Sequence, residues 1–169
     1  MAQCDNKSVG VVIKQDDDFV VILRKNYPVS YACVAGHLDG DTPRQAAIKE
    51  AGEEAHVSVD TLKRLFCGTF SNSCRRDGGG FHEWSIFEAV KWHGKVKAGS
   101  DAKEAYVFSL RKLSALAKRT RSFSKQSGIP LNRRHVDRFT KYVVDNPRWQ
   151  KSPGLEPVWV LMLEKIGII

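Results

Sequence analysis

The chain has 169 residues, of which 42% are hydrophobic and 27% are charged. This length suits one domain with an ordinary core, and the hydrophobic fraction excludes a disordered chain. No apolar run approaches the roughly 18 residues that cross a bilayer, so we expect no membrane-spanning segment. The first ten residues, MAQCDNKSVG, lack the apolar stretch of a secretory signal, and we therefore expect a cytoplasmic protein. The formal charge of +8 favours a polyanionic partner.

Residues 8–25 are predicted to form two strands around a turn. Hydrophobic residues, mostly β-branched, dominate both runs, and residues 15–18 separate them. The three aspartates of this turn are interpreted as a solvated hairpin tip, with metal binding as the alternative. Residues 31–34 predict another short strand, and residues 36–41 predict a loop.

The clearest helix start in the sequence is at Thr42. Thr42 can cap the helix, Pro43 occupies the first helical position, and Gln45 completes a T-x-x-Q capping box. Small apolar residues at spacings of three and four predict one buried face. We expect this helix to extend to about Ala55.

The rest of the chain mixes strands and helices without a regular βαβ rhythm. We therefore expect an α+β fold or an α/β sandwich, in one domain that spans residues 1–169. Residues 71–80, with three consecutive glycines, predict a mobile surface loop. The predicted strands are 65–70, 84–90 and 106–110. A basic helix begins over 111–119, a second helix covers 131–144, residues 145–154 are rich in turns, and a C-terminal helix covers 156–166.

The positive charge is concentrated in residues 111–141. Ten basic residues against the single acid Asp137 give this segment a charge of +9, which leaves −1 for the other 138 residues. Lysine and arginine contacts to phosphates supply sequence-independent affinity, so RNA is one candidate partner. The alternative is a pair of amphipathic surface helices with solvated charges. The basic residues are Arg111, Lys112, Lys118, Arg119, Arg121, Lys125, Arg133, Arg134, Arg138 and Lys141.

The four cysteines are Cys4, Cys33, Cys67 and Cys74. None of them belongs to a CxxC pair or to a spacing that is typical of a zinc site. We therefore expect reduced thiols in a cytosolic protein, with neither a disulfide nor a structural metal as the favoured role.

Three glutamates, Glu50, Glu53 and Glu54, lie near the C-terminal end of the predicted helix. Their spacing places them on one helix face, where the carboxylates repel one another and oppose the helix dipole. A divalent cation would offset these costs, and Mg²⁺ or Mn²⁺ prefers oxygen ligands. The alternative is a solvated acidic helix face.

Residues 36–57 resemble the Nudix box of the MutT-like Nudix hydrolases. That box has a glycine, five residues, a glutamate, seven residues, and then Arg-Glu-apolar-any-Glu-Glu-any-Gly-apolar. Here residues 42–48 provide the seven-residue spacer, and the three glutamates fall in register. The departures are a first loop of four residues, Asp41 for glutamate, Lys49 for arginine and His56 for the closing glycine. Lys49 lacks the bidentate fork of arginine, and His56 must adopt a turn conformation that glycine usually takes.

The resemblance covers about residues 8–118. It implies an α/β/α sandwich with a mixed sheet, to which residues 111–150 add a basic helical segment. It also implies Mg²⁺-dependent or Mn²⁺-dependent hydrolysis of a nucleoside diphosphate linked to another group.

The resemblance further implies roles for individual residues of the helix. Glu50, Glu53 and Glu54 would hold the metal, and Glu53 would also position the attacking water. Lys49 and Asp41 would orient these ligands.

A general base outside the helix is common in the family. Glu104 occupies a position where related chains often carry a loop glutamate, and Glu83 and Glu88 are its competitors. For each of the three, the alternative is a solvated surface acid.

Four residues are candidates for substrate contact. Gly36 and His37 lie at the entrance of the box, and Arg75 and Arg76 lie beside the three glycines, where they can close over phosphates. The alternatives are a structural loop histidine and a flexible charged hairpin tip.

The leading hypothesis is a metal-dependent Nudix pyrophosphohydrolase. Its candidate substrates are nucleoside triphosphates, ADP-ribose and other nucleotide sugars, dinucleoside polyphosphates, and 5′-capped or 5′-triphosphorylated RNA. The second hypothesis is a catalytically weakened module that binds RNA or a protein through the basic segment. An isomerase of an isoprenoid diphosphate is the third. Screening for hydrolysis with Mg²⁺ distinguishes the first hypothesis from the second.

Overall fold

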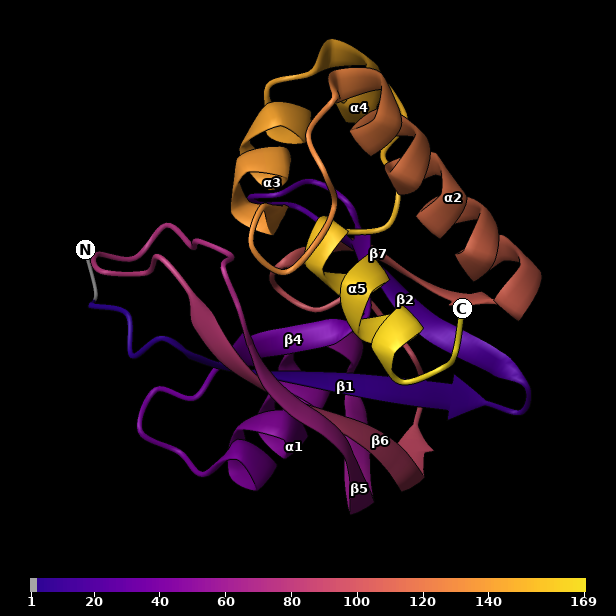
Figure 1. Cartoon of the computed structure of the whole chain (residues 1–169). Helices are drawn as coiled ribbons and strands as arrows, with labels where there is room; N and C mark the ends of the chain where they lie inside the picture. The colour runs from indigo at the N-terminus through magenta and orange to yellow at the C-terminus, as the bar shows by residue number, and fades with distance from the viewer. Residues whose placement is uncertain (1–2) are drawn as a thin grey trace.

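A computed structural model describes residues 3–169, whose strands form one mixed sheet between two helical layers (Figure 1). The strands are β1 (Lys7–Gln15), β2 (Asp18–Arg24), β3 (Tyr31–Ala32), β4 (Val34–His37), β5 (Val57–Phe70), β6 (His82–Gly94) and β7 (Ala102–Phe108). The helices are α1 (Pro43–Ala55), α2 (Leu110–Ser127), α3 (Val136–Val144), α4 (Pro147–Lys151) and α5 (Pro157–Lys165).

Strand β1 is the centre of the sheet and has two neighbours along one edge. Its residues 8–11 pair antiparallel with β4, and Lys14 and Gln15 pair antiparallel with β2 across the hairpin. Along its other edge, residues 7–13 pair in parallel with β6. Strands β3 and β7 pair with β2, and β5 pairs with β6. This arrangement brings the ends of β4 and β6 to the two sides of β1.

Side chains of β1 alternate between the two faces of the sheet. Val9, Val11 and Ile13 are buried in the core that α1 covers, whereas Val12 belongs to the core beneath the C-terminal helices. Gly10 also faces those helices, where a Cβ atom would lie 2.6 Å from the ring of Trp159. The predicted α/β/α sandwich with a mixed sheet is therefore confirmed.

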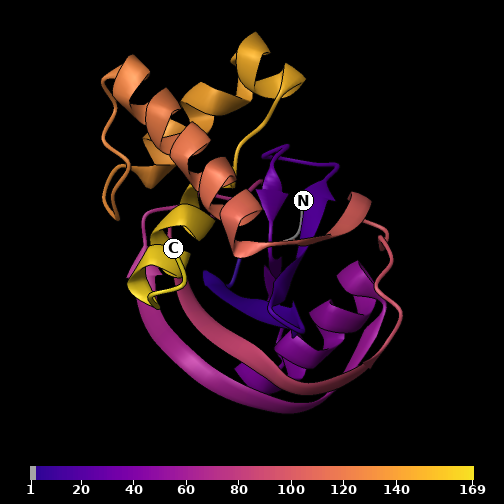
Figure 2. The ribbon, with the colours of Figure 1, turned by 90° about the vertical axis from the view of Figure 1, so that its right-hand side faces the viewer.

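The C-terminal helices form the second layer and bury the larger core. Trp149, Trp159, Phe139 and Leu113 are fully buried within it. Burying a large apolar side chain stabilises the fold by about 1.5–3 kcal/mol, so this layer contributes to the stability of the sandwich. Figure 2 shows α2 to α5 grouped together, away from α1. Between residues 3 and 169, no helix has both the length and the apolar content that crossing a membrane requires.

The strand predictions are correct for the first hairpin and less complete for the later strands. The predicted strand 31–34 is divided at Cys33 into β3 and β4, and β4 takes in Gly36 and His37, which the sequence assigned to a loop. Strand β5 begins directly after α1, eight residues before the predicted start at residue 65. Register shifts at three points of the β5–β6 pairing disturb the alternation that would have revealed the longer strand.

The helix predictions locate four of the five described helices. Helix α2 continues well beyond residue 119 and ends at Gly128, which has φ of 68°. Helix α3 begins at Val136 instead of residue 131, because residues 132–135 form a turn in which the side chain of Asn132 accepts two backbone N–H groups. Helix α4 was missed, since five residues leave no periodic pattern, although Asn146 caps it and Pro147 begins it.

Candidate functional site

A cavity of about 350 Å³ lies among α1, β4, the β5–β6 loop and the chain that follows β2. Glu50 and Glu54 of α1 contribute two carboxylates to its wall. The β5–β6 loop contributes Arg75 and Arg76, and the partly buried side chain of Arg24 lies at the end of β2. Acidic and basic groups therefore line the same cavity.

The local sequence fixes both ends of α1. The Thr42 hydroxyl accepts the N–H of Gln45 at 3.3 Å, and the Gln45 amide oxygen accepts the N–H of Thr42 at 3.1 Å. Pro43 begins the helix, which confirms the predicted capping box. At the other end His56 adopts the left-handed conformation, with φ of 56°. The histidine thus takes the turn that a glycine takes in the family's box.

Glu54 joins α1 to β4. Its side chain is buried, and its Oε2 atom accepts the backbone N–H of Ala35 at 2.9 Å. Burial raises the pKa of Glu54 to about 7, although the positive charge of Arg24 opposes the shift. A carboxylate held by a backbone donor at the cavity wall has one oxygen committed to the fold and one available for a ligand.

Glu50 lies one helical turn before Glu54 and rests against the backbone of Gly36. A Cβ atom on Gly36 would lie 1.8 Å from Oε1 of Glu50, so only glycine leaves room for this carboxylate. Burial, reinforced by the negative charge of Glu53, raises the pKa of Glu50 to about 7. The absence of a side chain at Gly36 therefore leaves the space that the carboxylate of Glu50 occupies.

Glu53 and Lys49 are exposed on α1 and do not line the cavity. Both still act on Glu50 through their charges, since Glu53 raises its pKa and Lys49 lowers it. The charge of Glu53 therefore acts on Glu50, and that of Glu50 acts on Glu54. Two of the three glutamates face the cavity, and the third lies at the solvent-exposed side of the helix.

The three acids predicted as general base do not line the cavity. Glu104 is exposed on β7, where it accepts a hydrogen bond from the hydroxyl of Tyr106. Glu88 pairs with Lys14 at 3.2 Å, and Glu83 lies on β6 opposite Thr69. None of these positions brings a carboxylate to Glu50 or Glu54 in this structure.

Two acids that the sequence did not single out do line the cavity. Glu156, directly before α5, is buried and pairs with Arg24 at 3.4 Å. Asp101, which precedes β7, lies at the same cavity. Their distance from α1 in sequence left no local pattern to reveal them.

Arg75 and Arg76 occupy different environments at the cavity. Arg76 donates two hydrogen bonds to the carboxylate of Asp39, which holds the pKa of that carboxyl below its usual value. The guanidinium of Arg75 lies over the ring of Tyr27, with its central carbon 5.4 Å from the ring centroid. Within residues 3–169 Arg75 has no ion-pair partner, so its charge is available to a phosphate.

His37 faces a second histidine instead of standing alone at the box entrance. Its Nε2 atom is 3.2 Å from Nε2 of His82, the first residue of β6. Burial, with the positive charge of Arg76 as a second cause, lowers the pKa of His37 to about 4. Burial likewise lowers the pKa of His82. His82 was not predicted as a site residue, because nothing in the sequence around it distinguishes it from an ordinary strand residue.

Part of the basic segment is committed to the fold. Arg121 pairs with Glu164 of α5, and Arg133 donates to the carbonyl oxygen of Thr69 at 2.6 and 3.0 Å. Arg119 donates to a backbone carbonyl at 2.6 Å. Five other basic residues are exposed and make no side-chain hydrogen bond or ion pair in the described part of the chain. These are Arg111, Lys118, Lys125, Arg134 and Arg138.

Comparison with known proteins places this geometry in a family. The family model of the NUDIX domain matches residues 5–127. The ADP-ribose pyrophosphatase of Methanocaldococcus jannaschii is 34% identical over 113 residues. That alignment covers 65% of this chain and 65% of the relative, so the chain spans slightly less than two thirds of the relative's length.

Solved structures share the fold at low sequence identity. The MutT NUDIX hydrolase from Burkholderia pseudomallei is 18% identical, with a TM-score of 0.54 over 63% of this chain and 84% of that chain. The NUDIX domain of Shewanella oneidensis NrtR, complexed with ADP ribose, is 17% identical, with a TM-score of 0.53 over 68% and 78%. A NUDIX hydrolase from Nitrosomonas europaea is 23% identical, with a TM-score of 0.52 over 65% and 76%.

Proposed function

Because the chain belongs to the NUDIX domain family, we propose that it is a metal-dependent pyrophosphohydrolase. Its substrate is a nucleoside diphosphate linked to another group, with ADP-ribose as the first candidate. The curated relative that is named an ADP-ribose pyrophosphatase supports this choice, as does the structural neighbour complexed with ADP ribose. The cavity volume of about 350 Å³ lies within the range of small-molecule sites.

One observation carries the proposal: Glu50 and Glu54 present two carboxylates from one helix face to the same cavity. Their pKa values are raised to about 7, mainly by burial, so two adjacent negative charges are costly there without a cation. Oxygen donors of this kind are the ligands that Mg²⁺ and Mn²⁺ prefer. We propose that Glu50, Glu53 and Glu54 hold the divalent metal.

Hydrolysis joins the oxygen of water to one phosphorus and breaks its bond to the bridging oxygen, which releases two phosphomonoesters. A bound divalent ion supplies charge neutralisation and lowers the pKa of a coordinated water. In this proposal Glu53 positions the attacking water from the solvent-exposed side of α1. Arg75 binds a non-bridging phosphate oxygen, since no residue of the described chain engages it in an ion pair.

Three other predicted residues have supporting roles in this proposal. Gly36 gives Glu50 its room, and Lys49 reduces the repulsion between the carboxylates. Glu104 stays an alternative general base, which would have to reach the substrate from the exposed face of β7. A pH–rate profile of Glu104→Gln that is the same as that of wild type would exclude Glu104 as the general base.

The test is a hydrolysis screen of the purified chain with Mg²⁺ and with Mn²⁺. The panel contains ADP-ribose, nucleoside triphosphates, a dinucleoside polyphosphate, a nucleotide sugar and 5′-triphosphorylated RNA. We expect cation-dependent release of AMP and ribose 5-phosphate from ADP-ribose. Failure to hydrolyse any member of the panel with either metal would overturn the proposal and favour a binding module.

The exposed part of the basic segment favours RNA as the second candidate substrate. Arg134 and Arg138 are exposed side chains without a hydrogen bond or ion pair to residues 3–169, as are Lys118 and Lys125 on α2. Phosphate contacts from such residues give affinity that falls steeply with salt. Removing all four charges should weaken RNA binding and reduce its salt dependence. We also propose a cytoplasmic location, which the four free thiols support.

A further inference from the structure

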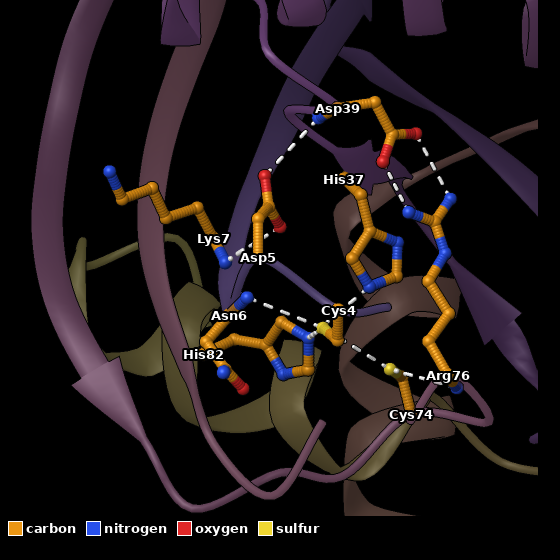
Figure 3. A network of polar contacts seen from close by, with 9 residues as sticks. All are labelled: Cys4, Asp5, Asn6, Lys7, His37, Asp39, Cys74, Arg76 and His82. Carbon is orange, nitrogen blue, oxygen red and sulfur yellow. Dashed lines mark hydrogen bonds and ion pairs between the residues drawn. The ribbon is translucent and has the colours of Figure 1, made fainter. Parts of the chain in front are cut away.

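Two cysteines and two histidines from four separate segments converge beside the cavity (Figure 3). Cys4 precedes β1, His37 ends β4, Cys74 lies in the β5–β6 loop, and His82 begins β6. One ligand atom from each residue lies within 4.8 Å of the corresponding atoms of the other three. These segments are held together by backbone bonds as well, since the N–H of Cys4 donates to the carbonyl oxygen of Asp77 at 2.8 Å.

We propose that Cys4, His37, Cys74 and His82 form a tetrahedral site for a structural Zn²⁺ ion. Two thiolates and two imidazoles are an established ligand set for structural zinc, and sulfur ligands disfavour magnesium. The site is distinct from the carboxylates of α1 and goes beyond the proposed hydrolysis. With four protein ligands the coordination is complete, so the ion would hold the fold and would not activate water.

The distances between the ligand atoms fit this geometry. The two sulfurs are 3.5 Å apart, Sγ of Cys4 is 3.2 Å from Nε2 of His82, and the two Nε2 atoms are 3.2 Å apart. A tetrahedron with ordinary zinc bond lengths has edges of about 3.8 Å between sulfurs, about 3.6 Å between sulfur and nitrogen, and about 3.3 Å between nitrogens. These three distances are slightly shorter than the expected edges, and the other three pairs of ligand atoms lie within 4.8 Å of one another.

The proton positions on His82 also favour a metal. Its Nδ1 atom lies 2.7 Å from the carbonyl oxygen of Asn72, which can only accept, so Nδ1 carries the proton. Nε2 of the neutral ring is then a bare lone pair directed at Cys4 and His37. A metal-binding histidine usually donates its other N–H to a carbonyl or carboxylate in this way.

Both sulfurs accept backbone hydrogen bonds of the kind that stabilise a thiolate. The N–H of Asn6 lies 3.3 Å from Sγ of Cys4, and the N–H of Arg76 lies 3.4 Å from Sγ of Cys74. In each case the donor is two residues after the cysteine. Two thiolates neutralise the charge of Zn²⁺, so the complete site would be neutral and compatible with burial.

The β5–β6 loop is shaped to leave room for Cys74. A Cβ atom on Gly79 would lie 2.4 Å from Sγ of Cys74 and 3.3 Å from Cβ of Cys4. The carbonyl oxygen of Gly79 accepts the N–H of Cys74 at 3.0 Å, which closes the turn around the sulfur. Gly80, the next residue, has no neighbour within 4 Å of such an atom. Gly79 is thus a position where an added methyl group would disturb Cys74, and Gly80 is its matched control.

The experiment measures metal content in the purified full chain and in Co²⁺-reconstituted protein. We expect one zinc ion per chain, and Co²⁺ spectra with thiolate charge-transfer bands and the visible bands of tetrahedral coordination. Cys74→Ser and His82→Ala should each lose zinc, whereas Cys67→Ser, which alters a cysteine outside the cluster, should retain it. Gly79→Ala should lower zinc affinity by about 10–100-fold, as expected for a perturbed ligand support, and Gly80→Ala should leave it unchanged.

Wild-type protein decides the question even if the ligand variants fail to fold. Four reduced thiols without zinc, and without the tetrahedral Co²⁺ spectrum, would overturn the proposal. Two reduced thiols, with Cys4 and Cys74 joined in a disulfide, would overturn it as well. Retention of zinc in the Glu53→Gln, Glu54→Gln double variant is expected, and its loss there would assign the metal to the carboxylates instead.

Discussion

Two groups of metal-binding side chains border one cavity, and they differ in almost every physical respect. Glu50, Glu53 and Glu54 come from a single turn of α1, and Glu50 and Glu54 face the cavity. The cysteine–histidine cluster, formed by Cys4, His37, Cys74 and His82, comes from four segments, with Cys4 and His82 buried and the other two residues partly buried. Oxygen ligands suit an exchangeable Mg²⁺ ion, whereas sulfur and imidazole ligands suit a permanently bound Zn²⁺ ion.

The difference indicates that the two groups have separate roles at the cavity, one structural and one catalytic. The β5–β6 loop carries Cys74 at one position and Arg75 at the next, so fixing the cysteine also fixes the residue proposed to bind phosphate. His37 follows Gly36, whose backbone adjoins the carboxylate of Glu50. The cluster would therefore hold the walls of the cavity while the carboxylates of α1 perform the chemistry.

The largest expected effect separates the two groups by activity. The double variant Glu53→Gln, Glu54→Gln should lose more than about 100-fold in ADP-ribose hydrolysis, because metal-assisted charge stabilisation is worth several kcal/mol. The amide oxygen introduced by Glu54→Gln would still accept the N–H of Ala35, so the fold should survive. Steady-state rates and circular dichroism measure the two outcomes. Wild-type activity in the double variant would show that α1 does not hold the catalytic metal.

The next effect tests the cysteine–histidine cluster through stability. Removing a ligand present at about 1,000 times its dissociation constant costs about 4 kcal/mol. For a chain of this size, that loss lowers the melting temperature by about 10 °C. Thermal unfolding with and without a strong zinc chelator gives the comparison. An equal shift in Cys74→Ser, which lacks a proposed zinc ligand, would mean that the chelator acts elsewhere.

A smaller effect tests whether activity depends on the space that Gly36 of β4 leaves for the carboxylate of Glu50. The added methyl group of Gly36→Ala would overlap the carboxylate of Glu50, so we expect about a 10-fold loss of activity with little change in zinc content. Gly52→Ala is the control, because its nearest neighbour would be 3.8 Å away. It should be active and slightly more stable, since alanine favours a helix over glycine. Full activity in Gly36→Ala would remove Glu50 from the metal site.

The smallest effect concerns the contact between α3 and the β5–β6 loop. Asp137 accepts hydrogen bonds from the backbone N–H and the hydroxyl of Ser73, and pairs with Lys141 at 2.8 Å. Burial alone would raise the pKa of Asp137, but the hydrogen bonds from Lys141 and Ser73 outweigh burial and lower this pKa below 3.8. A lowered pKa gives stability that is present above pH 3.8 and disappears as the pH falls through the folded-state value.

Asp137→Asn should therefore lower stability by about 1 kcal/mol at neutral pH, since it loses the charge beside Lys141 and at the start of α3. The difference from wild type should vanish in acid. Urea unfolding across this pH range measures it, with the exposed Asp145→Asn at the end of the same helix as control. A difference that persists below the folded-state pKa would indicate a packing effect instead of a charge effect.

Sequence information identified what is encoded locally. The bounds of α1 are predicted within a few positions by the capping residues Thr42 and Gln45 and by the left-handed His56. The arrangement of the three glutamates around the helix follows from their spacing. The β1–β2 hairpin is likewise a pattern of neighbouring residues. Strand β5 was shortened in the prediction because its register shifts interrupt the alternation.

The remaining features depend on pairing between distant segments. Spacing along the chain gave no zinc signature for Cys4 and Cys74, which are separated by 69 residues and meet only because β1 runs parallel to β6. Glu156 pairs with Arg24 because the C-terminal part of the chain folds back onto the sheet. No local pattern encodes such contacts. Neither the cysteine–histidine cluster nor the pair of Glu156 and Arg24 could therefore be predicted from the sequence alone.

The most direct test of the central claim combines rate and metal content in one comparison. ADP-ribose hydrolysis with saturating Mg²⁺, and bound zinc, would be measured on the same preparations of wild type and Glu53→Gln, Glu54→Gln. We predict cation-dependent formation of AMP and ribose 5-phosphate by wild type, a loss of more than about 100-fold in the double variant, and equal zinc in both. Equal rates in the two proteins would contradict the assignment of the chemistry to α1.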